Sequence, residues 1–246
     1  MRRFDGAAVA AVAMGLGLIG VGALSLALRD FAAVWQPVPA SWPGRPATPM
    51  VSALILLAAG AMMLFPRTRA WGAGLAAGFL GLWALALHLP RAVAHPAAWV
   101  SWNALAESTA MATGAFVALR QAQGREARAA VYLIGVCCVV FGVSHFVYAK
   151  FTAAMVPAWL PARLQFAWLT GAVHALTGVA LVLGVRRRWA AGVEAAMMTS
   201  FFLLVNLPGA LAAPGDHTQA FGAPIALTLS AAVWVLATSR AVERRA

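Results

Sequence analysis

Charged residues are scarce in this sequence. They make up 10% of the 246 residues, while apolar residues make up 63%. A typical water-soluble domain carries about 25% charged residues. A globule of this size has too much surface for a soluble fold to hide so large an apolar fraction inside. The scarcity of charge therefore excludes a water-soluble protein and predicts one that is embedded in lipid.

Cysteine is also scarce, and the common catalytic and cofactor-binding motifs are absent from the sequence. The two cysteines, Cys137 and Cys138, are adjacent, and neighbouring side chains on a helix point about 100° apart and rarely form a disulfide. No C-x-x-C motif is present, so we expect both thiols to pack as small apolar side chains. The sequence contains no P-loop, dinucleotide fingerprint, Ser-His-Asp set or zinc pattern. It therefore predicts no metal site and names no catalytic residue.

Long apolar runs are what the chain has in abundance. A helix needs roughly 20 apolar residues to cross about 30 Å of hydrocarbon. None of the runs alternates as a barrel strand does, so we predict an all-α membrane protein with eight transmembrane helices. The first run is too long for a signal peptide and lacks a small-residue cleavage site, which predicts a retained span. The expected spans are residues 6–28, 50–66, 71–90, 102–120, 129–148, 164–185, 189–207 and 223–240.

The formal net charge of +11 is explained by topology rather than by nucleic acid. With eight spans and a cytoplasmic N-terminus, 13 of the 18 basic residues fall on the inner side. The positive-inside rule then predicts that both termini lie in the cytoplasm. We expect the protein in the inner membrane of a bacterium. Anionic lipid headgroups are the expected partners of these arginines. The five outer residues are Arg29, Arg45, Arg91, Lys150 and Arg163.

A short segment occurs twice. "VPASWPGR" at residues 38–45 returns as "VPAWLPAR" at residues 156–163, an offset of 118 positions. Because the match continues without a gap, we predict a tandem duplication: a first four-span repeat (1–120), a cytoplasmic linker (121–128) and a second repeat (129–246). An even number of spans gives two parallel four-helix-bundle repeats related by an axis along the membrane normal. Further identities pair Gly60 with Gly178, Arg69 with Arg187, Trp71 with Trp189, and Leu89-Pro90 with Leu207-Pro208.

The duplicated segments themselves are expected on the outer side, each between the first and second span of its repeat. Their closely spaced prolines discourage a regular helix, and tryptophan suits the level of the lipid headgroups. We expect each to lie over the outer mouth of its repeat, although a plain interfacial loop is the alternative. The candidate interfacial residues are Pro39, Trp42, Pro43, Pro157, Trp159 and Pro161.

The second half, from "GVSHFVYAKF" through "VPAWLPAR" and "TGAVHALTG" to "GVRRRWAAG", resembles the DoxX-like family of four-span membrane proteins, and the first half resembles it more loosely. The resemblance implies a helical four-span unit. Where family members often carry a glutamate, this chain has His174. The family includes a membrane subunit of a thiosulfate:quinone oxidoreductase, proteins of redox-enzyme maturation and a receptor-assembly chaperone, so it implies no single reaction.

Polar residues inside the expected spans are the candidates for function, because ionisable groups in a bilayer are costly and usually face the bundle interior. Five fall in the outer half of the membrane, which predicts an outward-facing polar cavity in which Glu107 pairs with a histidine. The alternative is that each histidine bonds a backbone carbonyl or lies at the interface. Glu194 is expected to form a local salt bridge near Arg188 or to snorkel to the cytoplasmic surface. The five cavity candidates are His88, Glu107, His145, His174 and Asn206.

Three kinds of function remain open. The first is a binding or accessory/assembly subunit, without catalysis of its own, for a membrane-protein partner or a second copy of the chain. The second is the membrane subunit of a quinone-linked oxidoreductase, with quinone or a haem held by two histidines as the cofactor. The third is a transporter of a small molecule or lipid, with its site between the halves.

Overall fold

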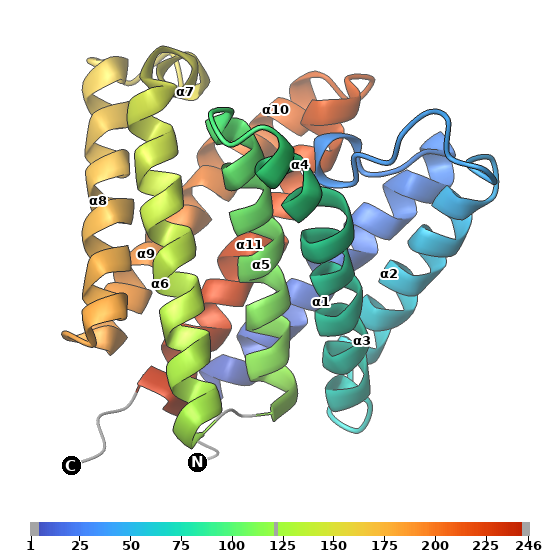
Figure 1. The fold of residues 1–246 in the computed structure, drawn as a ribbon, viewed down its shortest axis with the longest axis horizontal. Helices are drawn as coiled ribbons and strands as arrows, with labels where there is room; N and C mark the ends of the chain where they lie inside the picture. The colour runs from blue at the N-terminus through green and yellow to red at the C-terminus, as the bar shows by residue number, and fades with distance from the viewer. Residues whose placement is uncertain (1–4, 121–122, 243–246) are drawn as a thin grey trace.

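The computed structural model describes residues 5–120 and 123–242, and every regular element in these two ranges is a helix (Figure 1). The lengths and order of the long helices follow the apolar runs of the sequence. The helices are α1 (Gly6–Leu28), α2 (Thr48–Leu64), α3 (Arg69–Leu82), α4 (Leu89–Ala94), α5 (Trp99–Arg120), α6 (Gly124–Val147), α7 (Ala149–Met155), α8 (Arg163–Leu183), α9 (Arg187–Phe201), α10 (Leu207–Ala212) and α11 (His217–Thr238), with the short turns η1 (Ala33–Trp35), η2 (Trp83–His88), η3 (Phe202–Asn206) and η4 (Arg240–Val242).

Six helices in the described residues are long and apolar enough to cross a membrane: α1, α6, α8, α11 and the two continuous helices Arg69–Ala94 and Arg187–Ala212. These six helices agree with the prediction of a helical membrane protein. Two of the eight expected spans fall short of that standard. α2 has only 17 residues, and α5 is long enough but more polar, since it carries Asn103 and Glu107.

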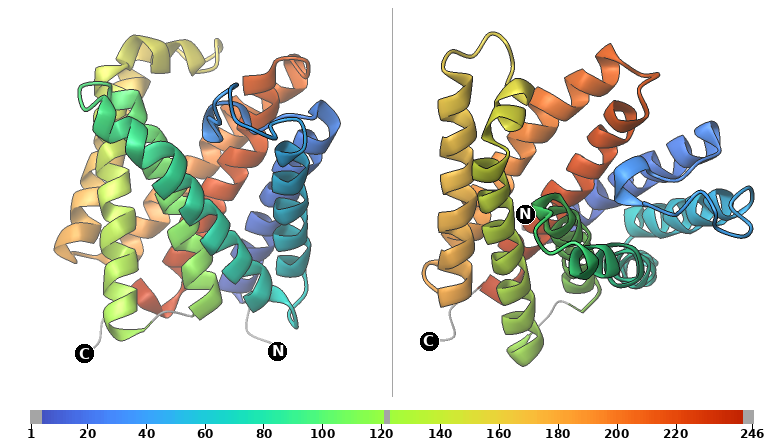
Figure 2. Two further views of the ribbon diagram at one scale, coloured as in Figure 1. Left: turned by 45° about the vertical axis from the view of Figure 1, so that its right-hand side comes forward. Right: turned by 45° about the horizontal axis from the view of Figure 1, so that its top comes forward.

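The long helices pack in one closed circuit. α1 lies along α2, which contacts α3, which contacts α5; α6 then lies along α8, which contacts α9, which contacts α11. The circuit closes twice between the halves, where α5 packs on α6 and α11 packs on α1, and α5 and α11 also contact each other. Both views in Figure 2 place the α1–α2 pair on the opposite side of the molecule from the α6–α8 pair.

The circuit differs from the expected pair of four-helix bundles. Within the first half, α1 barely touches α5, and α6 and α11 of the second half make still less contact. Each first helix instead packs against the last helix of the other half. Glycines allow close approach at these contacts: a Cβ on Gly20 of α1 would lie 2.8 Å from the Pro224 side chain of α11. The halves are therefore joined by extensive helix contacts as well as by the linker.

Each of the two continuous helices contains one π-helical turn, η2 or η3, immediately before a Leu-Pro pair. Proline has no N–H to donate, and its ring collides with the carbonyl four residues earlier. A wider turn at that place relieves the collision, so the helix continues past Pro90 to Ala94 and past Pro208 to Ala212. The expected spans ended at these prolines, several residues before the helices do.

The connections between the helices lie at the two ends of the molecule. The start of α1, the α2–α3 turn, the start of α6, the α8–α9 turn and η4 lie at the lower end in Figure 1, and the proline segments lie at the upper end. Both proline segments are irregular, as expected, and Trp42 and Trp159 are exposed. Arg45 fixes the first segment, because it donates to Asp30 at 2.9 Å and to the Val38 carbonyl at 2.7 Å.

Candidate functional site

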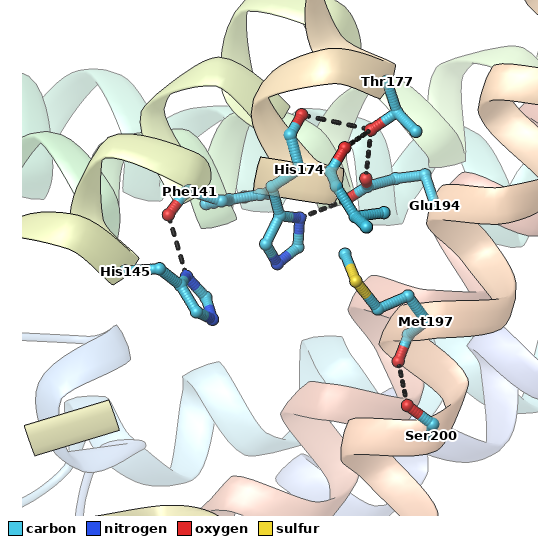
Figure 3. Close-up of polar contacts among 8 residues, drawn as sticks. Phe141, His145, His174, Thr177, Glu194, Met197 and Ser200 are labelled. Carbon is cyan, nitrogen blue, oxygen red and sulfur yellow. Dashed lines mark hydrogen bonds and ion pairs between the residues drawn. The ribbon is translucent and has the colours of Figure 1, made fainter. Parts of the chain in front are cut away.

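A buried carboxylate and a histidine meet between α8 and α9. His174 Nδ1 lies 2.5 Å from Glu194 Oε1, and Thr177 Oγ1 donates to the other carboxylate oxygen at 2.5 Å (Figure 3). His174 and Thr177 share one face of α8 because they are three residues apart. The His174 and Glu194 side chains are only 2% and 0% exposed. A charge so far from water is tolerated only with such partners, and this pair supplies them.

His145, near the C-terminal end of α6, lies against His174. The two ring centres are 4.8 Å apart and the ring planes are tilted by 52°. Phe201 of α9 stacks on His145 and also contacts His174, while Phe141 meets the edge of His174. These aromatic contacts hold both imidazoles in place, and His145 is only half-buried. The half-buried ring lies toward the end of the bundle where α6 ends.

The hydrogen bonds of the two histidines fix which ring nitrogens are free. His145 Nδ1 lies 2.9 Å from the Phe141 carbonyl oxygen, and a carbonyl only accepts, so this nitrogen carries the hydrogen. His174 Nδ1 likewise donates to the Glu194 carboxylate. In the described residues neither Nε2 atom has a hydrogen-bond partner. Each neutral ring therefore presents an unused lone pair on Nε2.

These contacts correct two sequence-based expectations. Glu194 was expected at the cytoplasmic surface with Arg188, but it is fully buried and bonds His174 and Thr177. Glu107 was expected to pair with a histidine, but its carboxylate accepts hydrogen bonds from Trp35 Nε1 and Asn103 instead. The carboxylate partner of His174 comes from the neighbouring helix α9.

Glu107 belongs to a second polar group, in the first half. Trp35 Nε1 donates to Glu107 at 2.7 Å, and Asn103 Nδ2 donates to the other oxygen at 2.8 Å. His88 Nε2 lies 3.0 Å from the carbonyl oxygen of the same Trp35 and donates to it. One residue of the loop after α1 thus connects η2 with α5, and His88 satisfies a backbone carbonyl, the alternative named for it above.

The five cavity candidates therefore fall into two groups. His88 and Glu107 meet through Trp35, and His145 and His174 meet each other. Asn206 is tied to the second group through Phe201, whose carbonyl oxygen accepts from Asn206 Nδ2 at 3.1 Å. Hollows of about 510 Å³ between α3, α5 and α6 and about 460 Å³ beside the loop after α1 are lined by other residues. In the described residues, neither of these two hollows is lined by any of the five candidates.

The geometry also bears on the expected cofactors. The two histidine rings are in contact at 4.8 Å, so a porphyrin does not fit between them as a bis-histidine haem would require. Across the described ranges no three or more histidine, cysteine, aspartate or glutamate residues are grouped so that they could hold a metal ion. A metal ion at this site would therefore have to combine the two imidazoles with a neighbour of another type.

Sequence reasoning missed Thr177, Glu194, Trp35 and Asn103 as members of polar groups. One signal was available for Glu194. It lies seven residues after the start of α9, and His174 lies nine residues before the end of α8, so both stand at a similar height above their shared turn at about 1.5 Å per residue. Nothing comparable marks Trp35, because its loop position is set by tertiary packing.

Comparison with known proteins adds one finding. A family model described as a domain of unknown function (DUF8561) matches residues 134–241, which run from α6 to η4. No curated protein and no solved structure matches the chain significantly. The matched region contains the whole of the His145, His174 and Glu194 group and none of the Glu107 group. The second half is thus similar to an independently recognised domain, while its function is left to the chemistry of the site.

Proposed function

We propose that the chain is a DoxX-like integral membrane protein with eight spans, made by duplication of a four-helix unit. The helix boundaries support the duplication. α5 (Trp99–Arg120) and α11 (His217–Thr238) have the same length and are offset by 118 positions, as are Arg69–Ala94 and Arg187–Ala212. Trp71 and Trp189, a pair at the same offset, are 75% and 76% exposed.

Glycine contacts between the first two helices of each half give independent support. A Cβ on Gly60 of α2 would lie 2.5 Å from the Gly15 carbonyl oxygen of α1, and one on Gly178 of α8 would lie 2.6 Å from that of Gly135 in α6. Both helix pairs thus cross at glycines, which permit close approach in lipid. The family-model match to the second half alone also fits a unit that occurs twice.

The orientation proposed is both termini in the cytoplasm of a bacterial cell, with the protein in the inner membrane. The arginine-rich α2–α3 and α8–α9 turns lie at the same end as the start of α1 and as η4, which supports one basic, cytoplasmic side (Figure 1). His145 then lies toward the outer face. Single cysteines placed in these turns and in the proline segments, labelled from one side only, would test the orientation.

The function we propose is that of a binding or accessory subunit whose centre is the group of His145, His174, Thr177 and Glu194. The observation that carries this proposal is the buried Glu194 carboxylate between spanning helices. Such a residue is expensive in a membrane and marks a functional site by default. The unused Nε2 atoms beside it are the groups available to a ligand. A membrane-protein partner or a second copy of the chain would pack against the apolar faces of the surrounding helices.

Native mass spectrometry of protein purified in lipid nanodiscs tests this role, because it reports any bound ligand or subunit by mass. We expect a bound mass on the wild-type chain that is lost in His145→Leu and kept in His95→Leu, a control at an exposed histidine. A chain that carries nothing in any form, or a bound mass indifferent to His145, would contradict the proposal.

The second candidate is the membrane subunit of a quinone-linked oxidoreductase. The observation in its favour is that both free Nε2 atoms accept hydrogen bonds, and the hydroxyl groups of a quinol donate them. A quinol retained by the wild-type protein and absent from His145→Leu, detected by lipid extraction and chromatography, would favour this candidate over a purely accessory role.

A further inference from the structure

Resting on the proposed binding function of the second half, we propose that His145 and His174 form a copper(I) site, with Met197 as a third, thioether ligand. The ion would bind at the two free Nε2 atoms. Three features of the described residues carry this inference: the orientation of the rings, the hydrogen-bond acceptors of their Nδ1 atoms and the charge of the site.

The acceptors that the two Nδ1–H groups bond are of the kind found next to metal-binding histidines. A metal-ligating histidine almost always donates its other ring N–H to a carboxylate or a backbone carbonyl. His174 donates from Nδ1 to Glu194, and His145 donates from Nδ1 to the Phe141 carbonyl. Both rings are thus held in the tautomer that leaves Nε2 free to coordinate.

The ring separation suits a shared ion. A metal about 2 Å from Nε2 lies about 3 Å from the ring centre, so two centres 4.8 Å apart subtend roughly 100° at the ion, close to a tetrahedral angle. In Figure 3 the two unbonded ring nitrogens point to the same side of the pair. Small rotations of the side chains would bring both onto one ion.

The third ligand follows from the helix register of α9. Residues 194, 197 and 201 recur at the spacing of one helix face. Glu194 contacts His174, and Phe201 contacts both histidines, so Met197 between them faces the same pair. In Figure 3 the Met197 side chain extends from α9 to the same side as that of Glu194. Methionine is flexible enough to move its sulfur onto a neighbouring ion.

The ligand set and the charge select the metal. Thioether sulfur favours copper(I), whereas magnesium and calcium require oxygen ligands. A zinc ion would need further N, S or O ligands to complete a tetrahedron, and no such group of three is present in the described residues. The single buried carboxylate, Glu194, balances the single charge of copper(I). A divalent ion would leave a net charge buried among spanning helices.

Copper(I) titration of the full chain in nanodiscs, against a chromophoric copper(I) chelator, tests the site. We expect one ion per chain, with affinity lowered at least 100-fold in His145→Ala and His174→Ala and about 10- to 100-fold in Glu194→Gln, which keeps the shape but removes the charge. His95→Ala should bind as the wild type does. X-ray absorption should report nitrogen and one sulfur neighbour, with the sulfur lost in Met197→Leu.

The inference is overturned if folded wild-type protein holds no copper(I) against the chelator, or if the histidine variants bind it unchanged. Size-exclusion chromatography and circular dichroism confirm that each variant is folded, and the wild-type measurements do not depend on any variant. If copper(I) does not bind but another mass is lost in His145→Leu, the metal assignment fails while the binding function stands. If neither is seen, both fail.

Discussion

The two halves of this protein share their helix order but bury different polar groups. At the 118-residue offset, His174, Thr177 and Glu194 of the second half correspond to Leu56, Ala59 and Ala76 of the first, all of them buried. The reverse holds elsewhere in the molecule, because Asn103 and Glu107 of the first half correspond to the buried Phe221 and Ile225 of the second.

The difference indicates that the polar groups are not needed to make the fold. The same helix crossing, α2 with α3 or α8 with α9, forms with an apolar interior in one half and with a buried carboxylate–imidazole hydrogen bond in the other. Such a buried polar pair is weak evidence for stability, since desolvation of the carboxylate offsets much of what its hydrogen bonds gain. The comparison therefore supports the proposed functional role of the His174–Glu194 pair and a structural role for the glycine crossings.

The largest effect is expected from Glu194→Ala. This change leaves His174 without its partner and Thr177 Oγ1 without one of its acceptors, deep between α8 and α9. Removing one member of a buried pair typically costs about 3–5 kcal/mol. Thermal unfolding in detergent should show a correspondingly large loss of stability. A variant as stable as the wild type would mean that the pair contributes nothing.

A smaller effect is expected at the glycine crossings, and it should be the same in both halves. Gly60→Ala and Gly178→Ala each press a methyl group onto the carbonyl of the glycine opposite, which should cost about 1–3 kcal/mol by overpacking. Gly192→Ala, where a Cβ meets nothing within 4 Å, is the control and should stabilise α9 by up to about 1 kcal/mol. Unequal losses at the two crossings would weaken the comparison of the halves.

A third change tests the polar group of the first half. Glu107→Gln keeps one accepting oxygen but turns an amide toward Trp35 or Asn103, so it should cost about 1 kcal/mol. Combined with Trp35→Phe it should cost less than the sum of the two single changes, because the replaced groups share one hydrogen bond. Strict additivity in thermal unfolding would contradict the contact.

Most of the helices, but little of the site, could be predicted from the sequence. Apolar runs of about 20 residues dictate helices because backbone groups in lipid must bond within their own segment. Three boundaries were misplaced at prolines: two helices continue past Pro90 and Pro208 through a π-helical turn, and α11 begins at His217 and contains Pro224. His145 and His174 were both among the predicted candidates, but their mutual contact and the carboxylate that joins His174 depend on how α6, α8 and α9 pack, which no local pattern encodes.

The sharpest test of the comparison is the change with the smallest expected effect on stability. His174→Leu, Thr177→Ala and Glu194→Ala together give the second half the residues of the first at these positions. Replacing both partners of a buried polar pair by apolar side chains can be nearly neutral or stabilising, so the triple variant should unfold within about 1 kcal/mol of the wild type or above it.

The same triple variant should lose whatever the site binds, because it removes one of the two free imidazole nitrogens and the carboxylate behind it. Thermal unfolding and ligand retention, measured on one preparation, then separate the two roles. If the triple variant proved as unstable as Glu194→Ala alone, the cost would come from lost packing rather than from an unpaired histidine. The polar interior of the second half would then be part of its fold, and the first half would no longer serve as its apolar counterpart.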